Sequence, residues 1–127
     1  MIQVLKRYSL FVLSGFYIFA GINHFLNPEF YLPLIPDYFS NAEFINVLAG
    51  LAEIILGIGL LIKKVRRVAI IGVVLMLLAF IPSHVYFIQK GSCIDGGLCV
   101  SNWIGWIRLV IIHPILIAWP LWYWKQS

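Results

Sequence analysis

Charged side chains are scarce in this sequence, and their scarcity excludes most classes of soluble protein. Only 11% of the 127 residues are Asp, Glu, Lys or Arg, whereas 62% are hydrophobic and the mean hydropathy is +0.97. Such a composition predicts a membrane protein. Basic residues outnumber acidic ones by nine to five. This excess does not indicate a nucleic-acid partner, because the basic residues lie at the ends of apolar segments.

The motifs of several catalytic classes are also absent. The sequence has no P-loop and no G-x-G-x-x-G, and the glycines of GLAEIILGIG lie inside an apolar segment, where they favour close helix packing. It contains neither C-x-x-C nor H-x-x-x-H, and no low-complexity tract. We therefore expect a single domain over residues 1–127 that holds neither metal nor haem. A metal set of His24, His84 and Glu53 stays open as an alternative.

Four apolar segments are each long enough to cross a hydrocarbon core of about 30 Å, which takes about 20 helical residues. They run over residues 8–26, 44–62, 68–88 and 103–124. These segments predict an all-α polytopic membrane protein, a bundle of four transmembrane helices. The first segment is long and lacks a clean small-residue cleavage site, so we expect it to be retained rather than removed as a signal peptide.

The charges that flank these segments predict their orientation. Only Lys90 lies outside the membrane on one side, whereas seven basic residues lie on the other: Lys6, Arg7, Lys63, Lys64, Arg66, Arg67 and Lys125. The positive-inside rule then places both termini and the middle loop in the cytoplasm. We expect a multi-pass protein of a bacterial inner membrane. The proline-rich and aromatic-rich loop over residues 27–43 should form a lid at the outer end.

A single acidic residue stands inside the second apolar segment. A charged side chain near the middle of a membrane costs roughly 2.5–3.5 kcal/mol on insertion scales, so Glu53 should face the bundle interior and have a partner. It shares a helical face with Asn46, Gly50 and Gly57. This small and polar stripe predicts that a neighbouring helix comes close and that space remains beside the carboxylate.

The partner predicted for Glu53 is Arg108, because a guanidinium stays charged in lipid and can grip a carboxylate with two parallel hydrogen bonds. Two interpretations of this pair stay open. The pair either clamps the second helix to the fourth, or it positions Arg108 to contact a polar ligand head.

Histidines complete the predicted site. His24 lies near the outer end of the first helix, on a stripe with Tyr17, and His84 lies near the outer end of the third helix after Pro82. Each histidine alone fits a satisfied position in the bundle as well as a ligand contact. Their clustering at the depth of Arg108 favours a pocket that opens outward and is floored by Glu53. The predicted ligand-binding residues are His24, Glu53, His84, Arg108, Tyr17 and His113.

The only two cysteines lie in the loop over residues 89–102. Cys93 and Cys99 enclose the turn CIDGGLC. On the oxidising side of a membrane, we expect a structural disulfide that closes this turn. A redox pair that exchanges electrons with a quinone is the alternative, although no base flanks the cysteines.

Motifs over nearly the whole chain resemble those of the DoxX and DoxX-like membrane proteins. They are AGINHFLNPEFYLPLIPDY, LAGLAEIILGIGLLIKKVRRVAI, FIPSHVYF and WIGWIRL, in this order. The resemblance implies a four-helix membrane bundle. Members have been linked to quinone-dependent sulfur oxidation and to complexes that handle thiol or oxidative stress, and a distant branch serves as a receptor-assembly chaperone.

Two functions are therefore expected. In the first, the pocket binds a quinone, with His24 and His84 supplying protons and Arg108 polarising a carbonyl, and a redox partner supplies electrons. Whether the chain is itself an enzyme or a subunit of an oxidoreductase stays open. In the second, the chain is a non-enzymatic assembly factor for a client protein or a lipid-binding module. A transporter with Glu53 as proton carrier is a third possibility, and it would require a homo-oligomer.

Overall fold

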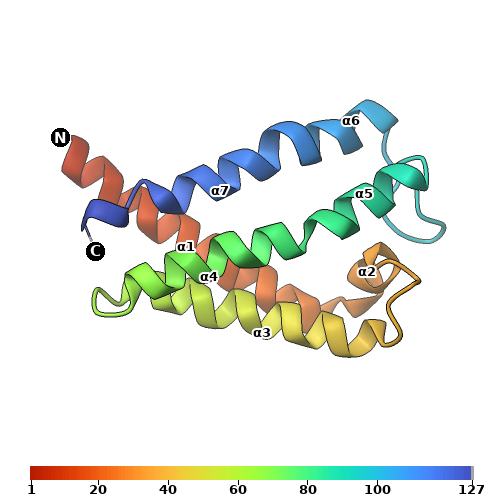
Figure 1. Cartoon of the computed structure of the whole chain (residues 1–127), viewed down its shortest axis with the longest axis horizontal. Coiled ribbons are helices and arrows are strands. Elements are labelled where there is room, and N and C mark those ends of the chain that lie inside the picture. Colours follow the sequence, from red (N-terminus) through yellow and green to blue (C-terminus); the bar gives the residue numbers. More distant parts are fainter. Residues whose placement is uncertain (127) are drawn as a thin grey trace.

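The structure, a computed structural model, describes residues 1–126, which form helices and turns but no strand. Four helical segments are long and apolar enough to cross a membrane: Ile2–Leu26, Ala42–Leu61, Arg66–Gln89 and Asn102–Leu121. They run up and down as a bundle (Figure 1). The predicted all-α, four-helix membrane architecture is confirmed, and the chain is a multi-pass membrane protein.

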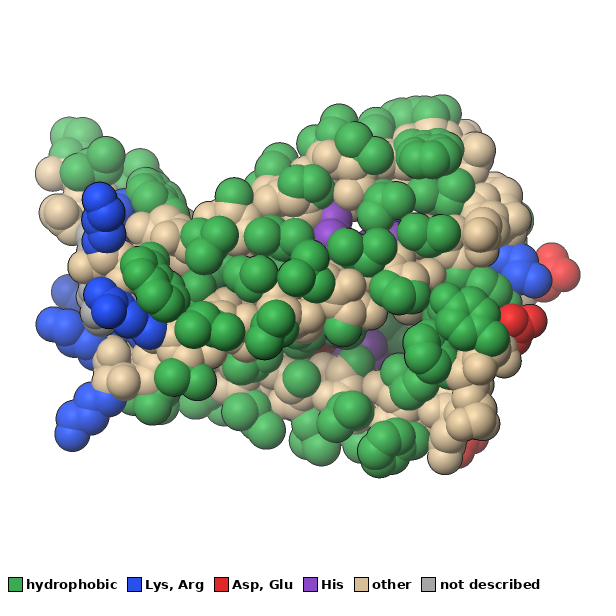
Figure 2. All heavy atoms as spheres, viewed as in Figure 1, with side chains coloured by type: hydrophobic (Ala, Val, Ile, Leu, Met, Phe, Trp, Pro, Cys, Tyr) green, Lys and Arg blue, Asp and Glu red, His purple; other side chains and the backbone are tan. Residues whose placement is uncertain are grey.

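The two ends of the bundle differ in charge. Both chain termini lie at one end, where Lys and Arg side chains gather, and the Asp and Glu side chains visible in this view lie at the opposite end (Figures 1 and 2). We call the first the basic end. The second is the loop end, because it carries the long connections over residues 27–41 and 90–101.

The first two long helices largely follow the sequence prediction. Helix α1 (Ile2–Leu26) begins before residue 8, because the helix continues through Lys6 and Arg7 beyond the apolar stretch. Helix α3 (Ala42–Leu61) begins after Asn41, whose side chain accepts a hydrogen bond from the backbone N–H of Phe44 at 3.0 Å. This cap satisfies one of the free donors of the first helical turn.

The third and fourth spanning segments are not continuous regular helices. The third divides into α4 (Arg66–Ala79) and α5 (Ile81–Gln89), because Pro82 lacks the N–H that would continue the ladder. The fourth consists of α6 (Asn102–Ile107), the π-helix η2 (Arg108–Ile112) and α7 (His113–Leu121). It is followed by the short 3-10 helix η3 (Trp124–Gln126).

Helices α1 and α3 pack closely along their glycines, as the small-residue stripe predicted. A Cβ atom added to Gly21 would lie 2.6 Å from the carbonyl oxygen of Gly50, closer than real atoms approach. The Ser14 hydroxyl donates to the carbonyl of Gly57 across the same contact. The missing side chains therefore let the backbones of the two helices approach, which brings the polar residues of α1 next to those of α3.

The apolar core lies in the half of the bundle near the basic end. It joins α1, α3, α4 and the C-terminal segment, and its fully buried members include Leu13, Tyr17, Leu60, Ile70, Val73 and Tyr123. In the other half the helices diverge toward the loop end, where α2 (Pro28–Tyr31) lies between them (Figure 1). This divergence leaves room for a cavity.

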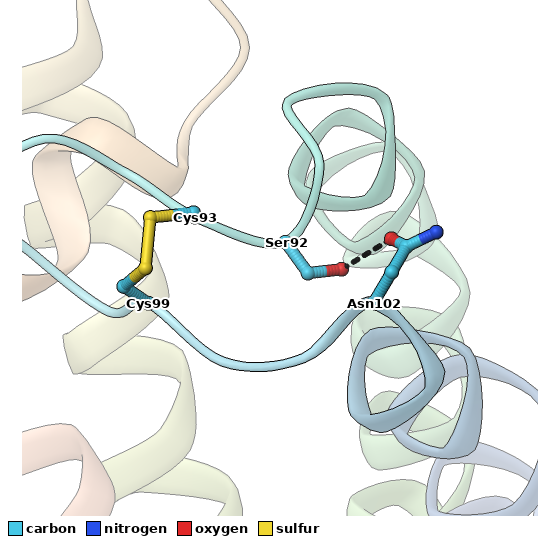
Figure 3. Close-up of a disulfide and its surroundings, with 4 residues drawn as sticks. All are labelled: Ser92, Cys93, Cys99 and Asn102. Atoms are coloured by element: carbon cyan, nitrogen blue, oxygen red, sulfur yellow. Dashed lines mark hydrogen bonds between the residues drawn. A yellow bond between two sulfur atoms is a disulfide. The ribbon is translucent and has the colours of Figure 1, made fainter.

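The second loop is fastened to the helices on either side of it. A disulfide joins Cys93 to Cys99, and the hydroxyl of the buried Ser92 donates to Asn102 Oδ1 at 2.9 Å (Figure 3). The backbone N–H of Ser92 donates to the carbonyl of Phe87 in α5. Because Asn102 begins α6, these contacts hold the ends of α5 and α6 together. The disulfide has the pairing expected from the sequence.

Candidate functional site

A cavity of about 650 Å³ lies between α3, α4 and α5, beneath a lid made of α2 and η1 (Leu32–Leu34). Four of the six predicted ligand-binding residues line it: His24, Glu53, His84 and Arg108. The lid contributes Phe30, Tyr31 and Leu34. Of the two remaining predicted residues, Tyr17 is buried in the apolar core, and His113 is buried behind His84.

One wall of the cavity carries a histidine, a carboxylate and an amide. His24 Nδ1 lies 2.7 Å from Asn46 Oδ1, and Asn46 Nδ2 donates to the carbonyl of His24 at 3.0 Å. His24 Nε2 lies 3.3 Å from Glu53 Oε2. The imidazole ring also stacks on Tyr31 of the lid, with 3.7 Å between ring centroids. These contacts hold His24 and the lid against α3.

The ion-pair partner of Glu53 is His24, and the prediction of Arg108 was wrong. The close packing of α1 on α3 brings His24 to the carboxylate, whereas Arg108 belongs to the fourth spanning segment. Both His24 and Glu53 are buried, with 8% and 6% of their surfaces exposed. A sequence reveals the depth of each residue along its helix, but not which helices touch at that depth.

The contacts of His24 favour its doubly protonated form. The Asn46 amide is oriented by its donation to the His24 carbonyl, so its oxygen faces Nδ1 and that nitrogen must donate. The other nitrogen faces a carboxylate oxygen, which a protonated nitrogen attracts and a bare lone pair repels. His24 and Glu53 together form a pair without net charge. Glu53 Oε2 makes no aligned hydrogen bond with any residue that the structure describes, so it can accept one from a ligand.

A second group of polar residues in the cavity is centred on Arg108, the first residue of the π-helix η2. Its guanidinium carbon lies 5.0 Å from the centre of the Phe87 ring, a cation–π contact. Among residues 1–126, the buried Nη1 atom has no hydrogen-bond partner. A buried and unsatisfied guanidinium donor is costly. Arg108 therefore has both the charge and the free donor needed to bind a ligand oxygen.

Two histidines meet beside Arg108. The rings of His84 and His113 make an edge contact with 4.7 Å between their centroids. His113 Nε2 donates to the carbonyl of Leu77 at 2.6 Å, near the break between α4 and α5. The fourth spanning segment is thus hydrogen-bonded to the third one near the break between α4 and α5. His113 holds the two segments together, while His84 faces the cavity.

The π-helix was not predicted, although the sequence contains a sign of it. The backbone N–H of His113 donates to the carbonyl of Arg108, five residues earlier, and Pro114 follows directly. Because proline has no N–H, the regular ladder cannot continue through that position. Single π turns are rare and are frequently found at functional sites. Here the turn begins at the one charged residue of the fourth spanning segment.

The charges around the cavity do not balance within the chain. His24 and Glu53 neutralise each other, and the other acidic residues of the sequence lie in or beside the loop-end connections: Glu29, Asp37, Glu43 and Asp95. No ion pair joins Arg108 to an acidic residue in the described part of the chain. The cavity wall thus keeps one positive charge, which favours a ligand with an anionic or strongly polarised oxygen.

The rest of the cavity is apolar and follows the seam between α3 and α4. Small residues line this seam at Ala49, Ala52 and Gly72. At its rim stand Leu48 and Leu75, which are 56% and 60% exposed. The seam therefore opens sideways on the bundle surface, where lipid would lie, and histidine is visible in recesses of this surface in Figure 2.

The cavity also extends further than the sequence indicated. It continues past Glu53 toward the basic end, as far as Leu56 and Gly72. Glu53 thus stands in the wall of the cavity rather than on its floor. Among residues 1–126, His, Cys, Asp and Glu form no group of three that is suited to hold a metal ion. His24, His84 and Glu53 line the same cavity but do not form such a group in the described part of the chain.

The fold and cavity define a class: a small four-helix membrane protein with a laterally open, mostly apolar cavity that carries a buried ion pair and a buried arginine. Within this class, the chain belongs to the family described as a domain of unknown function, DUF8561, whose model matches residues 13–124. The match includes every residue of the two polar groups. No curated protein and no solved structure matches the chain.

Proposed function

We propose that this protein binds a quinone in the cavity, as a DoxX-type protein that works alone or as the membrane subunit of an oxidoreductase. The observation that supports this most is that two polar groups and one apolar seam line the same cavity. His24 and Glu53 face the cavity from α1 and α3, and His84 and Arg108 face it from α5 and η2. Amphipathic ligands bind in such largely apolar sites with a few polar groups.

The polar groups suit the chemistry of quinone reduction. Reduction to the quinol adds two electrons and two protons, one proton at each carbonyl oxygen. His24 carries a proton next to the cavity, His84 is a second candidate donor, and Arg108 stabilises the negative charge that builds up on an oxygen as electrons arrive. The electrons would come from a partner protein. The chain itself would bind and orient the quinone ring and deliver protons.

The apolar seam suits an isoprenoid tail. Its small side chains leave a channel between α3 and α4, and its rim at Leu48 and Leu75 faces the lipid side of the bundle. A quinone dissolved in the bilayer would enter sideways through this rim, with its ring directed to the polar groups. No passage through water is then needed.

A binding measurement tests this proposal. Purified protein in lipid nanodiscs should bind menaquinone or ubiquinone, and R108Q should weaken binding by about 10-fold or more, because a hydrogen bond to a charged group contributes about 1.5–3 kcal/mol. H84A should weaken it less. The matched control is K90Q, which removes a positive charge from the loop end, where Lys90 lies over Tyr86 outside the cavity.

Three outcomes would count against quinone binding. They are a failure of the wild-type protein to bind either quinone, equal affinities for wild type and R108Q, and equal losses in R108Q and K90Q. A client protein that copurifies in mild detergent without any quinone would favour the alternative function, assembly of a partner complex. One observation supports that alternative. Over an apolar stretch of 18 residues, the fourth spanning segment buries only 17% of its residues in the bundle, against 28–33% for the same length of the others, which leaves a face for a partner helix or a second copy.

We also propose that the basic end faces the cytoplasm of a bacterial inner membrane, with the loop end outside. Seven basic residues at one end against Lys90 at the other support this orientation. The disulfide between Cys93 and Cys99 supports it too, because disulfides persist on the oxidising side of the membrane.

Thiol labelling of intact cells tests this orientation. A membrane-impermeant maleimide should label the protein only after treatment with a membrane-impermeant reductant, since the two cysteines are the only ones in the chain and are paired. A C93S/C99S variant should stay unlabelled under all conditions. Labelling of the wild type without reductant, or only after the inner face is exposed in inverted vesicles, would contradict the orientation.

A further inference from the structure

A second hollow lies at the basic end, and it shares Leu75 but no polar residue with the cavity described above. This groove has a volume of about 700 Å³ and lies between α4, the start of α1 and the C-terminal segment. Its wall is apolar, with Ile71 and Val74 from α4 and Leu121 from α7. Lys6 and Lys125 stand at its rim. An apolar groove with two ammonium groups at the membrane surface has the polarity of a phospholipid.

The rim of the groove is held in place by cations. Lys6 Nζ donates to the carbonyl of Trp122 at 3.4 Å and lies 4.9 Å from the centre of its ring. In the same way, Arg67 Nε donates to the carbonyl of Trp124 at 3.3 Å, with its guanidinium carbon 5.1 Å from that ring. Helices α1 and α4 thus each fix one tryptophan of the C-terminal turn. The groove is formed before any ligand arrives, which lowers the entropic cost of binding.

The surrounding charge selects an anion. None of the acidic residues that the structure describes lies at the basic end, where seven Lys and Arg residues gather (Figure 2). A lysine ammonium has three donors, and Lys6 uses one of them on Trp122. Two donors remain for a ligand. Tryptophans at this level are typical of the lipid headgroup region.

We propose that this groove binds an anionic phospholipid with two acyl chains. Its phosphate lies between Lys6 and Lys125, and one chain runs along the apolar wall of α4. Each lysine near an anionic headgroup strengthens binding, and the chain adds the burial of its methylene groups. The proposal does not rest on quinone binding, since the groove contains neither polar group of the cavity.

Lipid titration of the full-length protein tests the proposal. In a neutral detergent, phosphatidylglycerol should raise the melting temperature and remain bound in native mass spectrometry, and phosphatidylcholine with the same acyl chains should do neither. K6Q/K125Q should weaken phosphatidylglycerol binding by about 10-fold or more. The matched control is K63Q/K64Q, which removes the same charge from the same end at residues outside the groove.

K6Q also removes a contact that holds the C-terminal turn in place, so a single variant tests the site without that change. K125Q leaves the contact between Lys6 and Trp122 intact and should still weaken binding about threefold or more. If K6Q/K125Q and K63Q/K64Q weaken phosphatidylglycerol binding equally, the lysines act only by diffuse electrostatic attraction, and the proposed site is wrong. If phosphatidylcholine binds as tightly as phosphatidylglycerol, the lysines do not select an anionic headgroup, and the proposal is wrong. If glycerol phosphate, which has no acyl chains, raises the melting temperature as much as phosphatidylglycerol, a free phosphate suffices and the groove is not a lipid site.

Discussion

Replacing His24 with alanine is expected to lower the free energy of unfolding by about 3–5 kcal/mol, because the change leaves the Glu53 carboxylate buried without its ion-pair partner. The imidazole is the only group that the structure pairs with this carboxylate among residues 1–126. The same change removes the contact with Asn46 and the stacking on Tyr31. Unfolding in mixed micelles with increasing denaturing detergent, followed by helical circular dichroism, measures the loss.

A second substitution separates the charge from the packing. If the unpaired carboxylate causes most of the loss, H24A should cost much less in an E53Q background than in the wild type. The interaction between the two changes should then reach about 1–3 kcal/mol. Equal costs in the two backgrounds would mean that the lost contacts with Asn46 and Tyr31 dominate, and that Glu53 is not an ionised partner of His24.

This pair also marks the limit of what the sequence predicts about the site. Depth along each helix follows from counting residues, and this reasoning placed His24, His84 and Arg108 in the outer half of the membrane, above Glu53; all four line the same cavity. The pairing among them depends on which helices touch. The sequence contains the glycines that join α1 to α3, but Arg108 was preferred as the partner of Glu53 on chemistry alone.

The fold itself was largely predictable, because membrane-spanning helices must be long, apolar and internally hydrogen-bonded. The four segments follow from these rules, and the break between α4 and α5 follows from Pro82, which has no backbone N–H. The π-helix does not, because one extra residue in a turn changes neither hydropathy nor length. The lateral opening of the cavity was also missed. It follows the seam between α3 and α4, whose lining includes Ala52 and Gly72, and the facing of two helices cannot be read from either helix alone.

The close approach of α1 and α3 leads to the second large effect. G21L is expected to lower the free energy of unfolding by about 3 kcal/mol, the upper end of the usual cost of overpacking. A Cβ atom at Gly21 would lie 2.6 Å from the carbonyl oxygen of Gly50 and 2.9 Å from the backbone nitrogen of Ile54. Backbone atoms inside a helix cannot rotate away as a side chain can, so the two helices must separate.

The same helix provides the control for this substitution. A Cβ atom at Gly15 would meet nothing within 4 Å, so G15L should leave the stability unchanged or raise it by up to about 1 kcal/mol through better helix propensity. Separating α1 from α3 also moves His24 away from Glu53, so G21L should reduce quinone affinity as well, and G15L should not. If both variants unfold at the same denaturant concentration as the wild type, the glycine contact does not hold the two helices together. The ion pair would then lack the support that keeps it buried.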